Sequence, residues 1–283
     1  MQDPSQLVVH AADGRVLTGR SFGPATGAPV LFIAGAGTGK SMCFGEDLLD
    51  SAHVRLLTMD RPGMEGSDLH AQRTLATTVD DYRVFVEAAI GEPSVPVVAN
   101  SQGSVFGLGA AVAGWASQLV LVSPADEVAH PAIQAMLPAE AAQLAVLADE
   151  HPAEAARVFQ SFTPEAMEQM VLAGACHSDR ALYSDRRFLS LYREALEEGF
   201  ANGGAGYVRD TLIAMRPWAL SLDQIRIPVT VLFGEKDQSH SPDHGQILAQ
   251  RIRGARRRVI PGVGGALLWT RAQAVLEATQ RRE

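Results

Sequence analysis

Ser101 has neighbours whose types and spacing suit nucleophilic chemistry. It is the middle residue of Ala99-Asn100-Ser101-Gln102-Gly103, which follows an apolar run and precedes a segment rich in small residues. A strand that turns sharply into a helix at such a pentad forms a nucleophile elbow and exposes the serine hydroxyl. The turn is tight, so the residues two before and two after the serine must be small, as Ala99 and Gly103 are. The pentad therefore predicts that Ser101 is a nucleophile.

The backbone beside Ser101 could stabilise negative charge. In an elbow, the N–H of the next residue lies at the start of a helix and points to where an oxyanion forms. We therefore expect the N–H of Gln102 to be an oxyanion donor. A serine in a strand-to-helix turn can also be a simple helix cap, so the pentad needs support from the rest of the chain.

A second stretch, residues 34–41, allows a different chemistry. Its sequence, Ala-Gly-Ala-Gly-Thr-Gly-Lys-Ser, follows an apolar run and fits a relaxed phosphate-binding loop. In such a loop backbone N–H groups hold phosphates, Lys40 reaches the γ-phosphate and Ser41 binds Mg²⁺. Asp60, after the next apolar run, could be a second acid at the metal. This P-loop nucleotide-binding interpretation leaves the pentad around Ser101 unexplained, so it is the remote alternative.

The pattern along the chain predicts the elements that position these residues. An Asp-Gly turn between two alternating runs, 6–9 and 16–21, predicts a hairpin. Helical segments such as 75–90 and the closing 271–281 separate further apolar runs of strand length. These runs are residues 29–33, 54–60, 95–99, 119–122, 229–233 and 257–260. Strands that alternate with helices predict an α/β fold with a mostly parallel central sheet flanked by helices.

Residues 127–218 differ in character from the rest of the chain. Strand patterns disappear, and Ala, Glu, Leu, Met and Arg recur with helical periodicity. Because strands resume at residue 229, we interpret this block as a helical lid inserted between two sheet strands. The chain would then comprise a first core part (1–126), the lid (127–218) and a second core part (219–283).

Composition limits the class of protein. The chain has 283 residues, 47% hydrophobic and 20% charged, as in a soluble globular protein. It contains no apolar run of the ~18 residues that a membrane span needs and no secretory signal pattern at its start. The two cysteines, Cys43 and Cys176, have neither metal-ligand nor disulfide spacing. The net charge of −8 disfavours nucleic acid.

From these limits we expect a cytoplasmic protein whose partner is a small-molecule substrate or ligand. We expect no nucleic-acid or membrane partner, no metal and no organic cofactor, and a monomer or homodimer.

The order of the motifs resembles the α/β-hydrolase superfamily, in the serine hydrolase type with an α-helical cap. The resemblance covers nearly the whole chain. It rests on the glycine-rich loop after Ile33, Asp-Arg-Pro-Gly at 60–63, the pentad around Ser101, Gly-Glu-Lys-Asp at 234–237 and Pro-Gly-Val-Gly at 261–264.

The resemblance assigns roles to particular residues. It implies that Ser101 is the nucleophile and that Asp237, at the end of a strand, is the acid of the triad. It also implies that the loop from Ala34 to Ala36 is the oxyanion loop, with the N–H of Ala36 as second donor beside that of Gln102. Ala34 replaces the histidine that is usual in this loop.

The chain departs from the family at the general base. The family motif reads Pro-Gly-x-Gly-His, and Gly265 holds the position of the histidine here. Serine needs a neighbouring base, and loss of the histidine from a serine-protease triad costs on the order of 10⁶ in turnover. We therefore expect hydrolysis to be impaired, altered or engineered away, and Gly265→His to raise turnover.

Other residues could compensate for Gly265. His240 follows Asp237 at the carboxyl edge of the sheet, where active sites open, and is the best substitute base. His244 is interpreted as a surface or capping residue. Asp126 is a second possible acid, or a cap of the first lid helix. Without a substitute base, the chain would be a non-hydrolytic cyclase or isomerase, or a non-catalytic ligand-binding protein on the same scaffold.

Apolar residues of the lid and core predict an adaptable cavity. A small uncharged ester, lactone or amide would suit it. The residues expected to bind this substrate are Met42, Phe106, Met136, Trp218 and Leu267.

Overall fold

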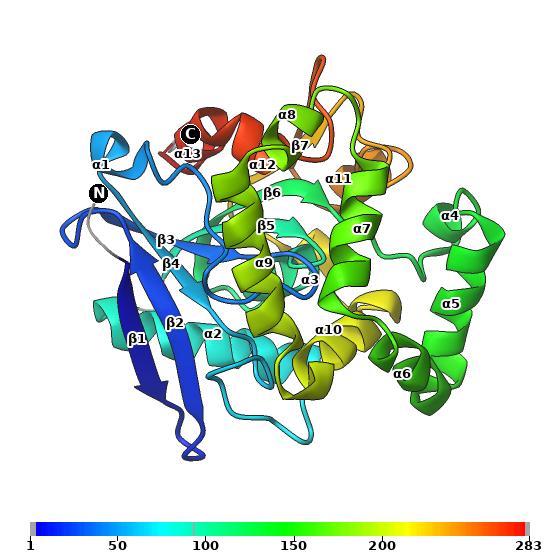
Figure 1. The fold of residues 1–283 in the computed structure, drawn as a ribbon, viewed down its shortest axis with the longest axis horizontal. Helices are drawn as coiled ribbons and strands as arrows, with labels where there is room; N and C mark the ends of the chain where they lie inside the picture. The colour runs from blue at the N-terminus through cyan, green and yellow to red at the C-terminus, as the bar shows by residue number, and fades with distance from the viewer. Residues whose placement is uncertain (1–3, 93, 281–283) are drawn as a thin grey trace.

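An eight-stranded sheet forms the centre of the computed structural model, which describes residues 4–92 and 94–280 (Figure 1). The strand order is β1-β2-β4-β3-β5-β6-β7-β8. β1 and β4 both pair with β2 in antiparallel fashion, and all other neighbours are parallel. The strands are β1 Ser5–His10, β2 Val16–Phe22, β3 Ala28–Ile33, β4 Val54–Met59, β5 Val95–Ser101, β6 Ala116–Pro124, β7 Val229–Gly234 and β8 Arg256–Ile260. The predicted α/β fold with a mostly parallel sheet is confirmed.

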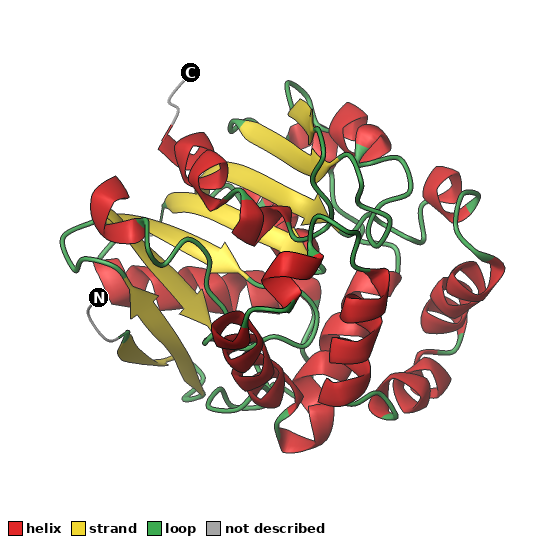
Figure 2. Cartoon of the chain, turned by 45° about the horizontal axis from the view of Figure 1, so that its top comes forward, coloured by secondary structure: helices red, strands yellow, loops and turns green. Residues whose placement is uncertain are grey.

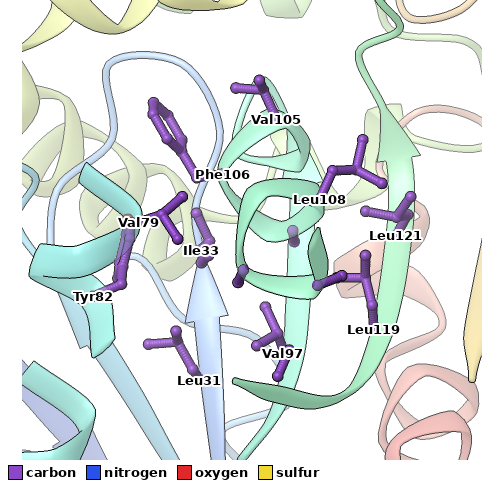
Figure 3. Packing of buried hydrophobic residues seen from close by; sticks show 14 of the residues in the cluster. Leu31, Ile33, Val79, Tyr82, Val97, Val105, Phe106, Leu108, Leu119 and Leu121 are labelled. Carbon is purple, nitrogen blue, oxygen red and sulfur yellow. The ribbon is translucent and has the colours of Figure 1, made fainter. Parts of the chain in front are cut away.

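Helices cover both faces of the sheet (Figure 2). Successive strand side chains point to opposite faces, so Leu31 and Ile33 pack with α2 and α3, whereas Val30 and Phe32 join the cluster on the other face, to which α12 and α13 contribute. Figure 3 shows the first cluster, in which α3 lies across β3, β5 and β6. The core helices are α1 Leu49–Ala52, α2 Leu75–Ile90, α3 Ser104–Val112, α11 Gln246–Arg251, α12 Leu267–Thr270 and α13 Ala272–Gln280.

The stretch between β6 and β7, all of it described, contains helices and no strand. These helices gather on the side of the sheet to which the parallel strands point (Figure 1). α7 packs against α9, and α10 packs against α5, α6 and α9. The helices are α4 Pro131–Gln134, α5 Ala139–Glu150, α6 Pro152–Gln160, α7 Pro164–Gly174, α8 Arg180–Tyr183, α9 Arg186–Phe200, η1 Asn202–Gly204, α10 Ala205–Met215 and η2 Leu222–Gln224. We refer to residues 127–218 as the helical insertion.

The described ranges limit two of the predictions. The closing helix expected over 271–281 is α13, and position 281 lies outside the described residues, as do the ends of the expected core parts at 1–3 and 281–283. None of the helices in the described ranges is long and apolar enough to cross a membrane.

Candidate active site

Ser101 ends β5 in a backbone conformation that is rare for residues other than glycine. Its φ angle is 50°, and α3 begins three residues later. Such strained conformations are held only where the surrounding structure fixes them, and they concentrate at active sites. A Cβ at Gly103 would lie 2.5 Å from the carbonyl oxygens of Ile33 and Ala34. The turn after Ser101 thus requires a glycine at 103, as expected for an elbow.

Ala99, the first residue of the pentad, is accommodated by a glycine on α3. Ala99 is fully buried, and a Cβ added at Gly107 would lie 2.7 Å from the Ala99 methyl group. Because residue 107 has no side chain, α3 leaves room for the Ala99 methyl group, and a glycine is not needed at position 99.

The loop after β3 lies directly beside Ser101. A Cβ added at Gly35 would be 3.2 Å from the Ser101 Cβ. The backbone N–H groups of Ala36 and Gln102 donate to no other atom in the part of the chain that the structure describes, and both residues line the same cavity as Ser101. These N–H groups are therefore available to an oxyanion on a substrate bound at Ser101.

A buried arginine braces this loop in place of the usual histidine. The Arg61 guanidinium donates to the carbonyl oxygens of Ala34 (2.9 Å) and Gly35 (2.8 Å). It also pairs with Asp210 of α10, as does Arg73, and all three side chains are fully or almost fully buried. Sequence reasoning missed this brace, because nothing in the residue pattern links Arg61 to Asp210.

We predict that Asp210→Ala destabilises the fold strongly, because it leaves two buried guanidinium groups without a counter-charge. Removing one partner from a buried ion pair costs about 3–5 kcal/mol. The matched control is Asp80→Ala, which removes an exposed carboxylate 3.8 Å from Arg83 and should cost less than about 1 kcal/mol. Urea unfolding measures both, and equal losses would contradict the assignment.

Asp237 and His240 form a hydrogen-bonded pair in the loop after β7. The His240 Nδ1 lies 3.0 and 2.9 Å from the two carboxylate oxygens of Asp237, and the Ser239 N–H lies 3.1 Å from Oδ1. Burial raises the pKa of the Asp237 carboxyl, but the charge and hydrogen bond of His240 and the Ser239 N–H outweigh it, so the pKa lies below its usual value. A carboxylate can only accept, so Nδ1 carries a proton, and Nε2 of a neutral ring would be free to accept one.

Gly265, at the position of the family histidine, lies against this pair. A Cβ at Gly265 would be 3.1 Å from Asp237 Oδ1, and 3.2 and 3.3 Å from Cε1 and Nδ1 of His240. The His240 ring thus occupies the space that a side chain at 265 would enter. The structure therefore places an imidazole next to the acid although position 265 is a glycine.

Polar contacts fix the loop that carries His240. The Ser241 hydroxyl lies 3.0 Å from Asp126 Oδ2, and His244 Nε2 donates to the Asp237 carbonyl oxygen over 3.0 Å. Burial raises the pKa of the Asp126 carboxyl. Asp126 also accepts the Glu127 N–H, and its hydrogen bonds to Glu127 and Ser241 fit a brace of the loop.

Asp179 of the helical insertion holds the turn that contains Gly265. Its carboxylate accepts the N–H groups of Gly264 (3.3 Å) and Ala266 (3.1 Å). A Cβ at Gly264 would lie 2.2 Å from Asp179 Oδ2 and 2.3 Å from Cys176 Sγ. Because Gly264 has no side chain, Asp179 and Cys176 of the insertion can pack against it. Because Gly265 has none, the His240 ring can lie beside it. No sequence signal indicated Asp179.

A cavity of about 620 Å³ joins these groups. Ser101, Gln102 and Ala36 line it together with His240 and Gly265. The remaining wall is mainly apolar or aromatic and includes Met42, Ile133, Met167, Phe188, Tyr192 and Trp269.

Of the residues expected to bind substrate, Met42 lines the cavity and the other four are placed elsewhere. Phe106 lies in the core cluster with Tyr82 (Figure 3). The Arg61 guanidinium lies 5.5 Å from the Phe106 ring centroid. Trp218 is buried with its indole N–H on the Ala214 carbonyl, Leu267 is fully buried, and Met136 is 42% exposed. An apolar residue type indicates burial, but not which internal surface the side chain reaches.

The loop that resembles a phosphate-binding loop is surrounded by acids. The Lys40 ammonium pairs with Asp60 (2.8 Å), Glu65 and Glu198 (3.3 Å). The Ser41 hydroxyl bonds to the side chain of Glu198. These carboxylates would repel a phosphate, so Lys40 and Ser41 stabilise the loop instead. Within residues 4–92 and 94–280, no group of three or more His, Cys, Asp or Glu side chains is placed to hold a metal ion.

Comparisons with known proteins identify the family and the fold of this chain. Residues 30–278 match the sequence model of the alpha/beta hydrolase family. No curated protein matches the chain. A probable hydrolytic enzyme from Pseudomonas aeruginosa PAO1 is similar in structure, with a TM-score of 0.72, 17% identity and coverage of 99% of this chain and 96% of that one.

Two further solved structures share the fold. A thermophilic esterase from Thermogutta terrifontis has a TM-score of 0.68 at 18% identity, covering 98% of this chain and 96% of its own. The enol-lactonase from Burkholderia xenovorans LB400 has a TM-score of 0.68 at 19% identity, covering 95% and 96%. At these identities the structures show a shared fold, and the sequence match over most of the chain shows that this protein belongs to the alpha/beta hydrolase family.

Proposed function

We propose that this protein is a serine hydrolase that cleaves small uncharged esters or lactones, with His240 as its general base. The observation that carries the proposal is the His240 ring, which is hydrogen-bonded to Asp237 and fills the space beside Gly265. In this arrangement the base follows the acid by three residues, instead of coming from the turn after β8.

The proposed reaction follows from the positions of these groups. Ser101 Oγ attacks the substrate carbonyl while His240 Nε2 takes its proton. The N–H groups of Ala36 and Gln102 stabilise the oxyanion, and the imidazolium then protonates the leaving group. Water then attacks the resulting acyl-enzyme while His240 takes a proton from the water, and the acid product leaves Ser101. Asp237 orients the ring throughout and stabilises its charged form.

The described structure contains no hydrogen bond between Ser101 Oγ and His240. Catalytic hydrogen bonds are often long in ligand-free enzymes and shorten when substrate binds. We expect the Ser101 hydroxyl and the His240 ring to approach each other when the substrate carbonyl enters the oxyanion site.

The cavity supports the choice of substrate class. Its lining contains no Lys or Arg from the described residues, and its walls are mainly apolar. A substrate carboxylate would therefore lose its hydration without gaining a counter-charge. The esterase and enol-lactonase that share the fold act on related bonds, as their names state. We further propose that the helical insertion acts as the cap over this cavity and that the protein is cytoplasmic.

Labelling by a fluorophosphonate probe tests the proposal. We expect wild type to be labelled at Ser101 and Ser101→Ala to be unlabelled. Ser104→Ala, at a buried serine that begins α3, is the matched control and should be labelled like wild type. Wild type that is inert to the probe and to p-nitrophenyl hexanoate would contradict the proposal and favour a cyclase, an isomerase or a ligand-binding protein.

A further inference from the structure

Two tyrosines of the helical insertion place hydroxyl groups at the apolar cavity. Tyr183 ends α8, Tyr192 lies in α9, and both line the cavity. Tyr192 as a residue is only 6% exposed, and neither its hydroxyl nor that of Tyr183 forms a hydrogen bond with any described residue. Tyrosine hydroxyls in an apolar environment usually find a hydrogen-bond partner, and neither of these two oxygens is completely enclosed by the protein. An unpaired and accessible hydroxyl at a ligand cavity therefore points to a partner that the ligand supplies.

Ring packing fixes the positions of both hydroxyls. Tyr192 stacks on Phe188 with ring centroids 6.2 Å apart, and Tyr183 packs edge-on to Phe188 at 5.7 Å. Trp269 contacts the same phenylalanine at 5.3 Å. Hydroxyls on such fixed rings need little reordering to bind a ligand.

Both hydroxyls are expected to remain protonated at neutral pH. Burial raises the pKa of each, and the neighbouring Tyr192, Asp179 and Asp237 raise that of Tyr183 further. Each group can therefore donate a hydrogen bond to an acceptor on the substrate.

We propose that Tyr183 and Tyr192 determine specificity by binding a second carbonyl or ether oxygen of the substrate. The preferred substrates are then esters or lactones that carry a hydrogen-bond acceptor apart from the scissile carbonyl. This inference rests on the proposed hydrolase function. It adds that the second polar group of the substrate binds at the part of the cavity formed by Tyr183 and Tyr192. Apart from Ser101, the other hydroxyl side chains in the lining already donate hydrogen bonds within the chain, namely Thr38, Ser239 and Ser241.

Matched esters test the inference. The substrates are p-nitrophenyl hexanoate and its 4-oxo and 5-oxo derivatives, which differ by one carbonyl. Wild type should prefer at least one oxo ester by roughly threefold to tenfold in kcat/KM, the usual worth of one neutral hydrogen bond. Tyr192→Phe or Tyr183→Phe should remove this preference, measured within each variant as the ratio of kcat/KM for the oxo ester to that for hexanoate. Tyr207→Phe, a buried tyrosine outside the cavity lining, is the control and should retain it.

Two results would overturn the inference: equal turnover of all three esters by wild type, or a preference that survives both cavity substitutions. Binding of the same esters to Ser101→Ala, measured by calorimetry, separates this inference from the proposed function. No hydrolysis together with a tyrosine-dependent binding preference would refute the hydrolase proposal alone. Hydrolysis without any preference, in turnover or in binding, would refute the specificity role alone.

Discussion

Replacing His240 with alanine is expected to lower kcat for p-nitrophenyl hexanoate by roughly 10⁴- to 10⁶-fold. The variant loses the ring that takes the proton from Ser101, and loss of the base is among the most damaging changes in a serine hydrolase triad. The residual rate over water would come from the oxyanion donors and from binding. KM should change little, because His240 is proposed to act mainly in the transition state.

The control for this experiment is His177→Ala, an exposed histidine of the helical insertion. Its turnover should equal that of wild type. Circular dichroism and urea unfolding would show that His240→Ala is folded. A His240→Ala enzyme that retains wild-type turnover would show that another group is the base.

Moving the histidine to position 265 gives the second large effect. Gly265→His alone should lower turnover by roughly 10- to 10²-fold, because the new side chain would displace the His240 ring, and small misplacements of catalytic groups have effects of this size. In the His240→Ala/Gly265→His double variant the space is free. That variant should recover at least about 10²-fold in kcat over His240→Ala.

Steady-state assays of kcat on wild type, the two single variants and the double variant measure this cycle. Gly265→Ala is the control for a side chain that crowds the His240 ring but cannot act as a base. Higher turnover in Gly265→His than in wild type would contradict the account. It would support the expectation from sequence alone that a histidine at position 265 raises turnover.

Local patterns were sufficient to predict most of the fold. The hairpin, the strands and the helix over 75–90 were predicted because residue alternation and helical periodicity report burial within one element. α7 and α10 were not predicted individually. α10 begins directly after Gly203 and Gly204, both with positive φ.

The site was predictable where its residues lie close in sequence. The elbow depends on five consecutive residues, and His240 lies three residues from Asp237. By contrast, Arg61 and Asp179 act through contacts with distant segments, which no local pattern reports. From the sequence, Gly265 showed only that the family histidine is missing. That the His240 ring occupies the space could not be predicted, because the sequence does not specify the conformation of the loop that carries His240.

The most direct test is a crystal structure of the protein with Ser101 phosphonylated. The account predicts the His240 Nε2 within about 2.6–3.2 Å of Ser101 Oγ or a phosphonyl oxygen, with Nδ1 on Asp237 and the N–H groups of Ala36 and Gln102 on the other oxygen. A His240 ring turned away from the adduct, with a different residue or no side chain in its place, would contradict it.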